Sequence, residues 1–510
     1  MEKPLSPSPS KRLVFVLRPI HFVRHFKDAV RIWLANGHQV HILFDTKLEN
    51  GEIPEILKPD LAEIERLQNQ FPQALTFEIQ NRFANEWTPI SKSIRTLRDY
   101  LRYFSKEYER AAFLRERLES QIPDNFIQLM KRPLLRKHWV VSLLCFVLDL
   151  LERALPVNQK VAAYLAQRAP DVVIVSPLIY VGSGQTEFLK AAKSLGIRSV
   201  FAVASWDNLT NKGVVKTVPE LMTLWNGVQK DEAIRMHGIP AEKIAITGAQ
   251  TFDECFRWKP TVDKDTFLKT AGLRPDQPFL LYLCSSKNIS LAEQAFIGEW
   301  LAAVRRASDV RLSSLGVLIR PYPLGGSIWE GKNLSEFGNI TVWPPTGELT
   351  YTPDALARLY DSIYYCEAVV GLNTSAMLEA AILSKPVLTV IADGCDNGQE
   401  GTLHFQYIRD GLVDVARSLG KHIASLSALF DGQDPFREKR KAFVQSFLRP
   451  QGIELDSAPF LAAAVEQQAA KGPIPVSMPP RWLAPLRWFL RRQLPKGKLT
   501  LPIAQNRVPA

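Results

Sequence analysis

Short apolar runs alternate with amphipathic helical stretches along most of the chain. Residues 12–17 and 39–44 are apolar segments that predict buried strands, and residues 21–36 between them have helical spacing that stops before Gly37. A strand, a helix and a second strand in this order form a βαβ unit, whose strands run parallel. The same alternation returns after residue 170 and again after residue 278. The pattern therefore predicts an α/β protein with two parallel sheets.

The expected domain boundaries follow from this alternation. The expected strands are 12–17, 39–44, 171–175, 199–204, 221–225 and 243–247 in the first half, and 279–284, 317–320, 340–343, 368–371, 387–391 and 412–416 in the second. We expect a disordered N-terminal tail at 1–11, a Rossmann-like domain at 12–255, a second at 256–450, and a C-terminal helix with a basic, Pro-rich tail at 451–510. Two doubly wound domains of this kind bind ligands at the carboxyl ends of their strands.

One segment interrupts the alternation in the first domain. Residues from about 90 to 155 are helical throughout, rich first in Arg, Tyr and Leu and then in apolar residues. We interpret them as a helical insertion that covers the sheet or shapes an acceptor pocket. Helix pairs that pack only for stability are the alternative.

Composition narrows the class of protein. The chain has 510 residues, of which 46% are hydrophobic and 23% charged, which excludes a mainly disordered or polytopic membrane protein. Its longest apolar run, 139–151, contains Asp149 and is shorter than the about 20 residues of a membrane span. The amino terminus lacks the apolar core of a signal peptide. Five scattered cysteines without a CxxC pair argue against a disulfide framework or structural zinc, so we expect a cytoplasmic protein.

Positive charge is concentrated at the carboxyl end. Of the net charge of +11, residues 471–510 supply +8, with eight Lys and Arg and no acid. Within them, residues 481–498 mix Arg and Lys with Trp482, Trp488 and Phe489, a pattern typical of contact with an anionic membrane surface. A solvated disordered tail is the alternative reading. No nucleic-acid motif accompanies the charge, so no nucleic-acid partner is expected.

The sharpest candidate site follows the expected strand 368–371. Asn373, Thr374 and Ser375 stand where the next helix begins, and their hydroxyls, free N–H groups and helix dipole favour an anion. Glu379 lies one turn further along the same helix face, within reach of a ribose diol. The alternative is simple capping of the helix by these side chains.

Four motifs together resemble one superfamily. Asn373–Glu379 with Lys385, Pro386 and Val387 is similar to the nucleotide-binding helix of GT-B-type glycosyltransferases, a fold shared with teichoic-acid glycerophosphotransferases and sugar-nucleotide 2-epimerases. Residues 243–253 resemble the last N-domain strand entering the interdomain linker, and residues 399–405 resemble a loop beside the donor. Residues 318–323 resemble an Arg/Lys-Pro-His-Pro segment, in which Tyr322 takes the place of His. The resemblance implies a GT-B fold, with the acceptor in the first domain and a nucleotide donor in the second.

Further donor-site candidates follow other strands of the second domain. Arg320 ends a strand and can grip a diphosphate bidentately, or form a surface ion pair. Ser285 and Ser286 follow another strand, in a phosphate-binding loop or an ordinary polar turn. Glu400 and His404 belong to a Gly-rich stretch that closes over the donor, or forms a plain surface loop.

The first domain offers candidate catalytic residues. His21 follows the first strand, where many inverting GT-B transferases carry the general base, and neutral imidazole can take a hydroxyl proton at pH 7. A structural histidine is the alternative, and His25, one turn later, is expected only to pack. Asp207 follows another strand and is expected to orient His21 or bind acceptor hydroxyls.

The predicted activity is metal-independent transfer of a sugar from a nucleotide-sugar donor to a hydroxyl of a carbohydrate or lipid-linked acceptor. We expect it to serve surface polysaccharide or lipid-linked glycan synthesis at the inner membrane face, with no cofactor besides the donor. The alternatives are a glycerophosphotransferase using a CDP-linked polyol and a catalytically silent GT-B scaffold. An epimerase is disfavoured, because the sequence places too few acidic and basic groups around the sugar.

Overall fold

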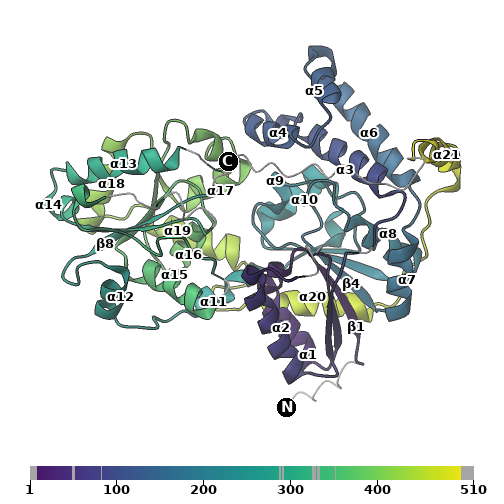
Figure 1. The fold of residues 1–510 in the computed structure, drawn as a ribbon, viewed down its shortest axis with the longest axis horizontal. Helices are drawn as coiled ribbons and strands as arrows, with labels where there is room; N and C mark the ends of the chain where they lie inside the picture. Colours follow the sequence, from purple (N-terminus) through teal and green to yellow (C-terminus); the bar gives the residue numbers. More distant parts are fainter. Residues whose placement is uncertain are drawn as a thin grey trace.

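Two parallel sheets, each covered by helices, form two lobes that face each other (Figure 1). The computed structural model describes residues 9–494 except 47, 49–51, 82, 287–288, 290–291, 324–328, 330–333 and 351. The first sheet has the order β3-β2-β1-β4-β5-β6-β7 and the second β10-β9-β8-β11-β12-β13. The α/β class with two doubly wound domains, predicted from the alternation, is therefore confirmed.

The N-terminal lobe is built on a sheet of seven strands. These are β1 (Arg12–Leu17), β2 (Gln39–Phe44), β3 (Leu75–Ile79), β4 (Val172–Ser176), β5 (Arg198–Ala202), β6 (Leu221–Leu224) and β7 (Ile244–Ile246). The central strands are apolar because helices cover both faces, and the residues 13–17 are all buried. Sequence analysis missed β3, an edge strand whose last four residues are exposed or half-buried and so lack an apolar run.

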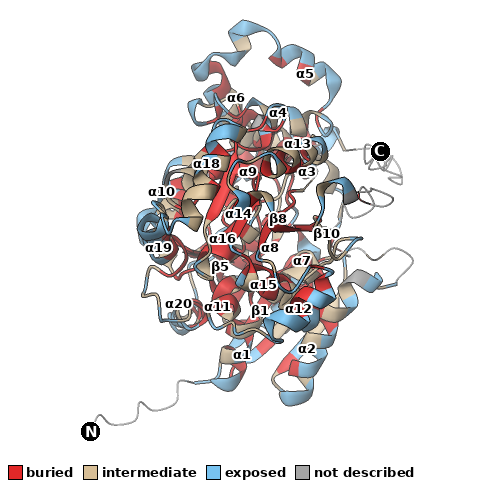
Figure 2. Ribbon diagram, turned by 90° about the vertical axis from the view of Figure 1, so that its left-hand side faces the viewer, coloured by how far each residue is buried: buried red, intermediate tan, exposed pale blue. Residues whose placement is uncertain are grey.

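The C-terminal lobe is built on six strands. These are β8 (Phe279–Leu283), β9 (Gly316–Arg320), β10 (Ile340–Val342), β11 (Ala368–Gly371), β12 (Val387–Val390) and β13 (Asp414–Ala416). Every pair in both sheets is parallel, so each lobe presents all its strand carboxyl ends at one edge. Figure 2 shows the buried residues gathered in the sheets and the helix faces that cover them.

Helices connect and cover the strands. Those of the first lobe are α1 (Lys27–Ala35), α2 (Lys58–Gln70), α7 (Gln159–Arg168), α8 (Thr186–Ser194), α9 (Asn208–Asn211) and α10 (Gly227–His237), with α3 (Thr88–Arg102), α4 (Ala112–Glu119), α5 (Asp124–Met130) and α6 (His138–Ala154) in the insertion. The rest are α11 (Asp253–Phe256), α12 (Lys264–Ala271), α13 (Glu293–Arg305), α14 (Val310–Ser313), α15 (Pro353–Tyr365), α16 (Ala376–Ile382), α17 (Leu403–Gly411), α18 (Leu419–Phe430), α19 (Arg437–Phe443), α20 (Ala458–Ala470) and α21 (Ala484–Arg492).

The chain crosses between the lobes twice. After α19 and a π-helical turn (Val444–Leu448), it returns to the first lobe, where α20 packs on α1. Leu461 and Val465 of α20 are buried in the core of the first lobe, and the Trp33 Nε1 donates to the carbonyl of Ala462 at 3.2 Å. The first lobe is thus completed by residues 458–470 as well as by residues 12–255.

Asp253, in the first segment that connects the lobes, binds the second segment, by which the chain returns. Its carboxylate, 1% exposed, accepts the backbone N–H of Ser457 at 2.9 Å and that of Ala458 at 2.9 Å at the start of α20. It also accepts Arg449 Nη2 at 3.1 Å, and Arg449 follows the π-helical turn of the second crossing. The buried Asp253 carboxylate therefore binds both segments that connect the two lobes.

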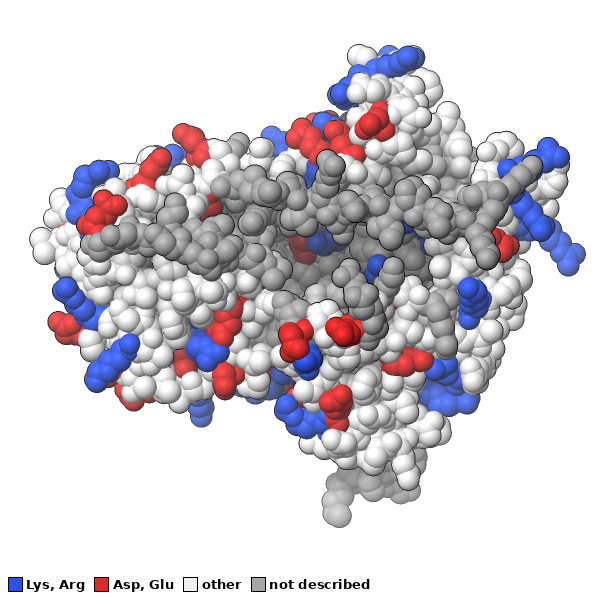
Figure 3. All heavy atoms as spheres, viewed as in Figure 1, with Lys and Arg blue, Asp and Glu red and all other residues white. Residues whose placement is uncertain are grey.

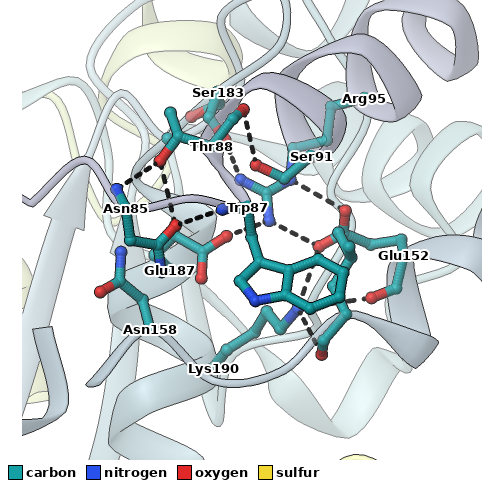
Figure 4. A network of polar contacts seen from close by, with 12 residues as sticks. Asn85, Trp87, Thr88, Ser91, Arg95, Glu152, Asn158, Ser183, Glu187 and Lys190 are labelled. Carbon is teal, nitrogen blue, oxygen red and sulfur yellow. Dashed lines mark hydrogen bonds and ion pairs between the residues drawn. The ribbon is translucent and has the colours of Figure 1, made fainter. Parts of the chain in front are cut away.

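The insertion projects from the first lobe as an arm, which we define as residues 103–148 (Figures 1 and 2). Its base is tied down by Arg95 of α3, which is 1% exposed and donates to both carboxylate oxygens of Glu152 at 2.9 and 2.7 Å (Figure 4). Arg95 also pairs with Glu187 and donates to the carbonyl of Ser183 at 3.0 Å. Among the described residues, no helix combines the length and the apolar character needed to cross a bilayer.

Replacing Asp253 is expected to loosen the hinge. Asp253→Ala leaves two buried helix N–H groups unpaired and leaves Arg449 with Asp456 as its remaining carboxylate partner, so we expect the free energy of unfolding to fall by about 2–4 kcal/mol. Asp456→Ala is the control, because Asp456 is 33% exposed and its pair with Arg449 is worth at most about 1 kcal/mol. Urea unfolding followed by circular dichroism measures both, and equal losses in the two variants would contradict this role of Asp253.

Candidate functional site

A cavity of about 690 Å³ lies between the lobes, at the carboxyl ends of both sheets. Figure 3 shows the surface hollowed there. The first lobe contributes the segments after β1, β5 and β7, and the second lobe contributes α15 and the start of α16. Its polar lining includes Arg24, His25, Lys27, Asp60, Ser205, Asp207, Lys212, Gln250, Thr251, Glu254, Thr352, Tyr360, Ser375 and Glu379.

Histidines follow β1 in a short 3-10 helix (Ile20–His25) that precedes α1. The described cavity lining includes His25 but not His21. His25 Nδ1 lies 2.7 Å from Thr251 Oγ1, across the cavity floor from β7. His21 is partly buried against the ring of Phe22, with centroids 5.2 Å apart. Burial and then Arg24 lower the pKa of His21 to about 4 and that of His25 to about 3, so both are neutral at pH 7.

Side chains of the insertion bind the backbone of the loop that follows β5. Arg102 donates to the carbonyls of Leu209 at 2.8 Å and Gly213 at 2.7 Å. Tyr108 donates to the carbonyl of Thr210 at 2.8 Å, and Tyr103 and Arg117 bind the carbonyls of Lys212 and Asn211. A short loop whose carbonyls are all bound by side chains is rigid, so the insertion positions the loop that carries Asp207.

Asp207 faces the cavity in a strongly polar setting. Burial by itself would raise its pKa, but Lys212, whose Nζ lies 3.6 Å from Oδ2, together with His404 and the Ser205 hydroxyl, holds the pKa well below its usual range. The Ser205 hydroxyl donates to Oδ1 at 2.6 Å. Asp207 is therefore a permanent anion, suited to orient a hydroxyl or a cation.

The second lobe contributes Ser375 and Glu379 to the cavity. Ser375 is exposed, stands immediately before α16 and makes no capping hydrogen bond with its side chain. Burial raises the pKa of Glu379 to about 7, against the opposing effects of the Tyr360 hydroxyl, 3.5 Å away, and of Arg320. In the first lobe, burial likewise raises the pKa of Asp60 to about 6. The cavity thus holds two carboxyl groups that change protonation near neutral pH.

Four more predicted donor residues lie behind this lining. Asn373 is 3% exposed, and its backbone N–H donates to Ser285 Oγ at 3.2 Å. Ser285 is buried, and its own N–H donates to Glu293 at 2.8 Å. Thr374 and Ser286 are partly buried and stand outside the cavity lining among the described residues. Of these four residues, the structure thus joins Asn373 and Ser285 by a hydrogen bond, and none of the four lines the cavity among the described residues.

His404 connects the two lobes beside Trp206, a residue of the cavity lining. Asn373 Nδ2 donates to the carbonyl of Gly398 at 2.7 Å and lies 3.2 Å from His404 Nε2. On the other side of the ring, His404 Nδ1 lies 2.7 Å from the side-chain amide nitrogen of Asn211 of the first lobe. The ring also packs edge-on against Trp206, with centroids 4.7 Å apart. Burial lowers the pKa of His404 to about 4, although Asp207 opposes the shift.

Arg320 and Glu400 are engaged elsewhere. The Arg320 side chain is 5% exposed, donates to the carbonyl of Arg358 and to Ser362 Oγ at 3.1 Å each, and stands outside the described cavity lining. Glu400 pairs with Arg417 at 2.8 Å and with Arg409 at 3.5 Å. Of the sequence-predicted residues, the structure thus brings Asp207, Ser375 and Glu379 into the cavity, and His404 packs against Trp206 of the lining from outside it.

Several lining residues were missed by sequence reasoning. Arg24, His25 and Lys27 follow β1, and Thr251 and Glu254 follow β7, so the strand-end rule was the signal that could have found them. Asp60 of α2 carries no such signal, because it reaches the cavity only through the packing of a helix. Among the described residues, no group of three His, Cys, Asp or Glu side chains is arranged to hold a metal ion. Metal independence stays a prediction.

Comparisons with known proteins identify the fold. No family model matches the chain, and no curated protein matches it significantly. A solved structure assigned as a UDP-N-acetylglucosamine 2-epimerase from Listeria monocytogenes is 10% identical, with a TM-score of 0.50, covering 91% of this chain and 97% of that chain. A glycosyltransferase from Rickettsia africae is 9% identical, with a TM-score of 0.48, covering 91% and 99%. The wall teichoic acid polymerase TagF is 10% identical, with a TM-score of 0.43, covering 90% and 89%.

At such low identity, the likeness to the epimerase structure shows the fold alone. It confirms the fold that the resemblance implies, with two facing Rossmann-like domains. The substrate and the reaction have to be argued from the cavity itself.

The contact of His404 with both lobes predicts an acid-sensitive structure. Because its pKa is about 4 in the folded protein and about 6.5 when unfolded, the unfolded chain binds the extra proton between these values. Stability attributable to His404 is complete above pH 6.5 and falls as the pH drops, by about 3 kcal/mol at pH 4. Urea unfolding at pH 7 and pH 4.5 should show a smaller pH dependence for His404→Gln than for wild type. The exposed His138→Gln control should match wild type, and an unchanged pH dependence in His404→Gln would refute this role.

Proposed function

We propose that the protein is a GT-B-type transferase that uses a nucleotide-activated donor, most specifically a nucleotide sugar. The observation that carries the proposal is the cavity of about 690 Å³, which both lobes line at the carboxyl ends of their parallel strands. Its volume lies within the range of about 300–1,000 Å³ typical of small-molecule sites. Facing lobes allow one substrate to bind to each and to meet in the middle.

The donor nucleotide is proposed to bind to the second lobe. Glu379 is placed to accept hydrogen bonds from a ribose diol, and the exposed Ser375 hydroxyl, two residues after the buried Asn373, is placed to donate to a phosphate. Lys27 and Lys212 of the first lobe supply positive charge across the cavity, each facing one carboxylate at 2.8 and 3.6 Å. Such cations stabilise the charge that develops on a leaving diphosphate.

The acceptor hydroxyl is proposed to bind to the first lobe. His25 lines the cavity as a neutral imidazole, and its hydrogen bond with Thr251 fixes the direction of the ring. Asp207, ionised and held by the insertion, is placed to orient the acceptor. His21, the base expected from the resemblance, remains the competing proposal, because it lies one turn away on the same 3-10 helix.

The chemical class of the acceptor follows from the basic carboxyl end. We propose a carbohydrate or lipid-linked hydroxyl acceptor presented at an anionic membrane surface, which residues 481–498 contact. In the described part of that segment, Trp482, Trp488 and Phe489 are more than half exposed beside four arginines. Residues 495–498 lie outside the described residues.

An epimerase is the second candidate, on one specific observation. The cavity is lined by six carboxyl groups, those of Asp28, Asp60, Glu63, Asp207, Glu254 and Glu379. Inversion at a sugar carbon needs a proton to be removed and returned, and carboxyl groups with pKa values of about 6 and 7 suit that step at neutral pH. These six carboxyl groups are acidic groups of the kind whose absence from the sequence analysis disfavoured an epimerase.

Nucleotide binding tests the donor site. Calorimetry with UDP, CDP and GDP should detect binding of at least one, weakened about tenfold by Ser375→Ala or Glu379→Gln, since each removes a hydrogen bond of about 1.4 kcal/mol. Because the ionised Glu379 is the acceptor, affinity should rise with pH through about 7, and Glu379→Gln should abolish that rise.

The exposed Glu299→Gln on α13 is the control and should bind like wild type. If none of the three nucleotides binds, or if all variants bind equally, the donor site is refuted. Binding without turnover of any donor would favour the silent scaffold.

Product analysis tests the reaction and its base. A radiolabelled donor incubated with membrane extract should yield labelled acceptor, and His25→Ala should lower kcat by about 10²–10⁴-fold if His25 is the base. His21→Ala is the matched comparison, and the larger loss in that variant would transfer the role to His21. Isomerised donor formed without extract would establish the epimerase, and transfer of a polyol phosphate from a CDP-linked donor would establish the glycerophosphotransferase.

A further inference from the structure

The exposed apolar side chains of the protein are concentrated in two segments. Of the 17 large apolar side chains exposed among the described residues, nine lie within residues 129–147 and 482–489. The first segment belongs to the arm, which stands out from the body in both views (Figures 1 and 2). A cluster of this kind on a projecting element marks an interaction surface.

Helix α6 has one face packed in the arm and the opposite face exposed. Val141 is buried in the core of the insertion, whereas Trp139, Leu143 and Phe146 are 63%, 53% and 58% exposed. Positions 139, 143 and 146 follow the spacing of one helix face. The exposed row is thus a continuous apolar stripe, which includes Val147 and is preceded by Leu134, and not a set of isolated residues.

Positive charge precedes this stripe in the sequence, whereas the carboxylates of Glu107 and Asp149 line a pocket beside Phe146. Lys131, Arg132, Arg136 and Lys137 are exposed and lie just before α6, and no acidic residue occurs between Asp124 and Asp149. Figure 3 shows basic side chains at the outer end of the arm. Apolar residues flanked by cations fit the headgroup region of an anionic bilayer.

Helix α21 adds further exposed aromatic side chains and arginines at the base of the arm. Leu483 and Leu490 pack in a cluster with Ala154 of α6, and Arg487 Nε donates to the Ala154 carbonyl at 2.8 Å. Trp488 and Phe489 stay exposed, with the Arg492 guanidinium 3.6 Å from the centre of the Trp488 ring. The aromatic and basic residues of the tail are therefore anchored to the helix that carries the stripe.

We propose that the arm is a membrane-docking surface, in which the stripe Trp139, Leu143, Phe146 and Val147 enters the interface of an anionic bilayer and the cations at 131–137 bind its headgroups. The helix lies on the bilayer and does not span it, since its 17 residues extend only about 25 Å. A second copy of this chain is the less suitable occupant, because a symmetric contact would bring the two basic clusters together. The proposal rests on the membrane contact proposed above for residues 481–498, and it assigns the main contact with the membrane to the arm instead of the tail.

Vesicle binding tests the proposal without any nucleotide. The full-length protein should co-sediment with phosphatidylglycerol-containing vesicles, more weakly as salt rises, and hardly with phosphatidylcholine alone. Trp139→Ser with Phe146→Ser should lower the affinity about tenfold or more, since both remove large apolar groups from the interface. Lys131→Gln with Arg132→Gln should lower it about tenfold or more on the anionic vesicles only.

Val310→Ser is the matched control, because Val310 is 76% exposed on the other lobe, and it should bind vesicles like wild type. Trp488→Ser with Phe489→Ser tests the tail separately, and a loss in this variant with none in the arm variants would overturn the proposal. Absence of vesicle binding, or a dimer in light scattering that only the arm variants dissociate, would also overturn it. Unchanged nucleotide calorimetry in the arm variants separates this outcome from failure of the donor site.

Discussion

The buried carboxylate of Asp253 is the interaction on which the geometry between the lobes depends. It lies where the chain first leaves the N-terminal lobe, and it binds the segment by which the chain comes back. A cavity lined by two lobes has a defined width only if the connections between those lobes are defined. Asp253 binds both connections, and Glu379 of one lobe and His25 of the other line the same cavity.

The insertion connects two features that are far apart in the sequence. Through Arg102 and Tyr108, its inner side binds the carbonyls of the loop that carries Asp207. Its outer side carries the apolar stripe of α6. One helical element thus touches the cavity loop on one side and presents the proposed membrane surface on the other. If the proposed membrane contact holds, an acceptor drawn from a bilayer meets a loop whose backbone is bound by the same insertion.

Much of the fold could be predicted from the sequence, and less of the site. Central strands such as β11, and β1 after the exposed Arg12, are apolar and were predicted with the bounds that the structure has, because burial on both faces leaves a pattern that is readable locally. The edge strand β3 was missed for the opposite reason. In the site, Ser375 and Glu379 follow directly from the end of β11. The direction of the Arg320 side chain depends on its contacts with Ser362 and Glu348, which are distant in the sequence. Asp60 reaches the cavity only through the packing of α2. Neither position could therefore be predicted from the neighbouring residues in the sequence.

Helix α20 belongs to the first lobe although it comes near the end of the chain. The hydrogen bond between Trp33 and Ala462 joins residues 429 positions apart, and the apolar faces of α1 and α20 cover each other. While the protein is being made, the N-terminal lobe therefore leaves the ribosome with part of its core open to water until residues 458–470 have emerged. Such a nascent lobe is a natural client for chaperones, and its folding is completed only once residues 458–470 are available to pack on α1.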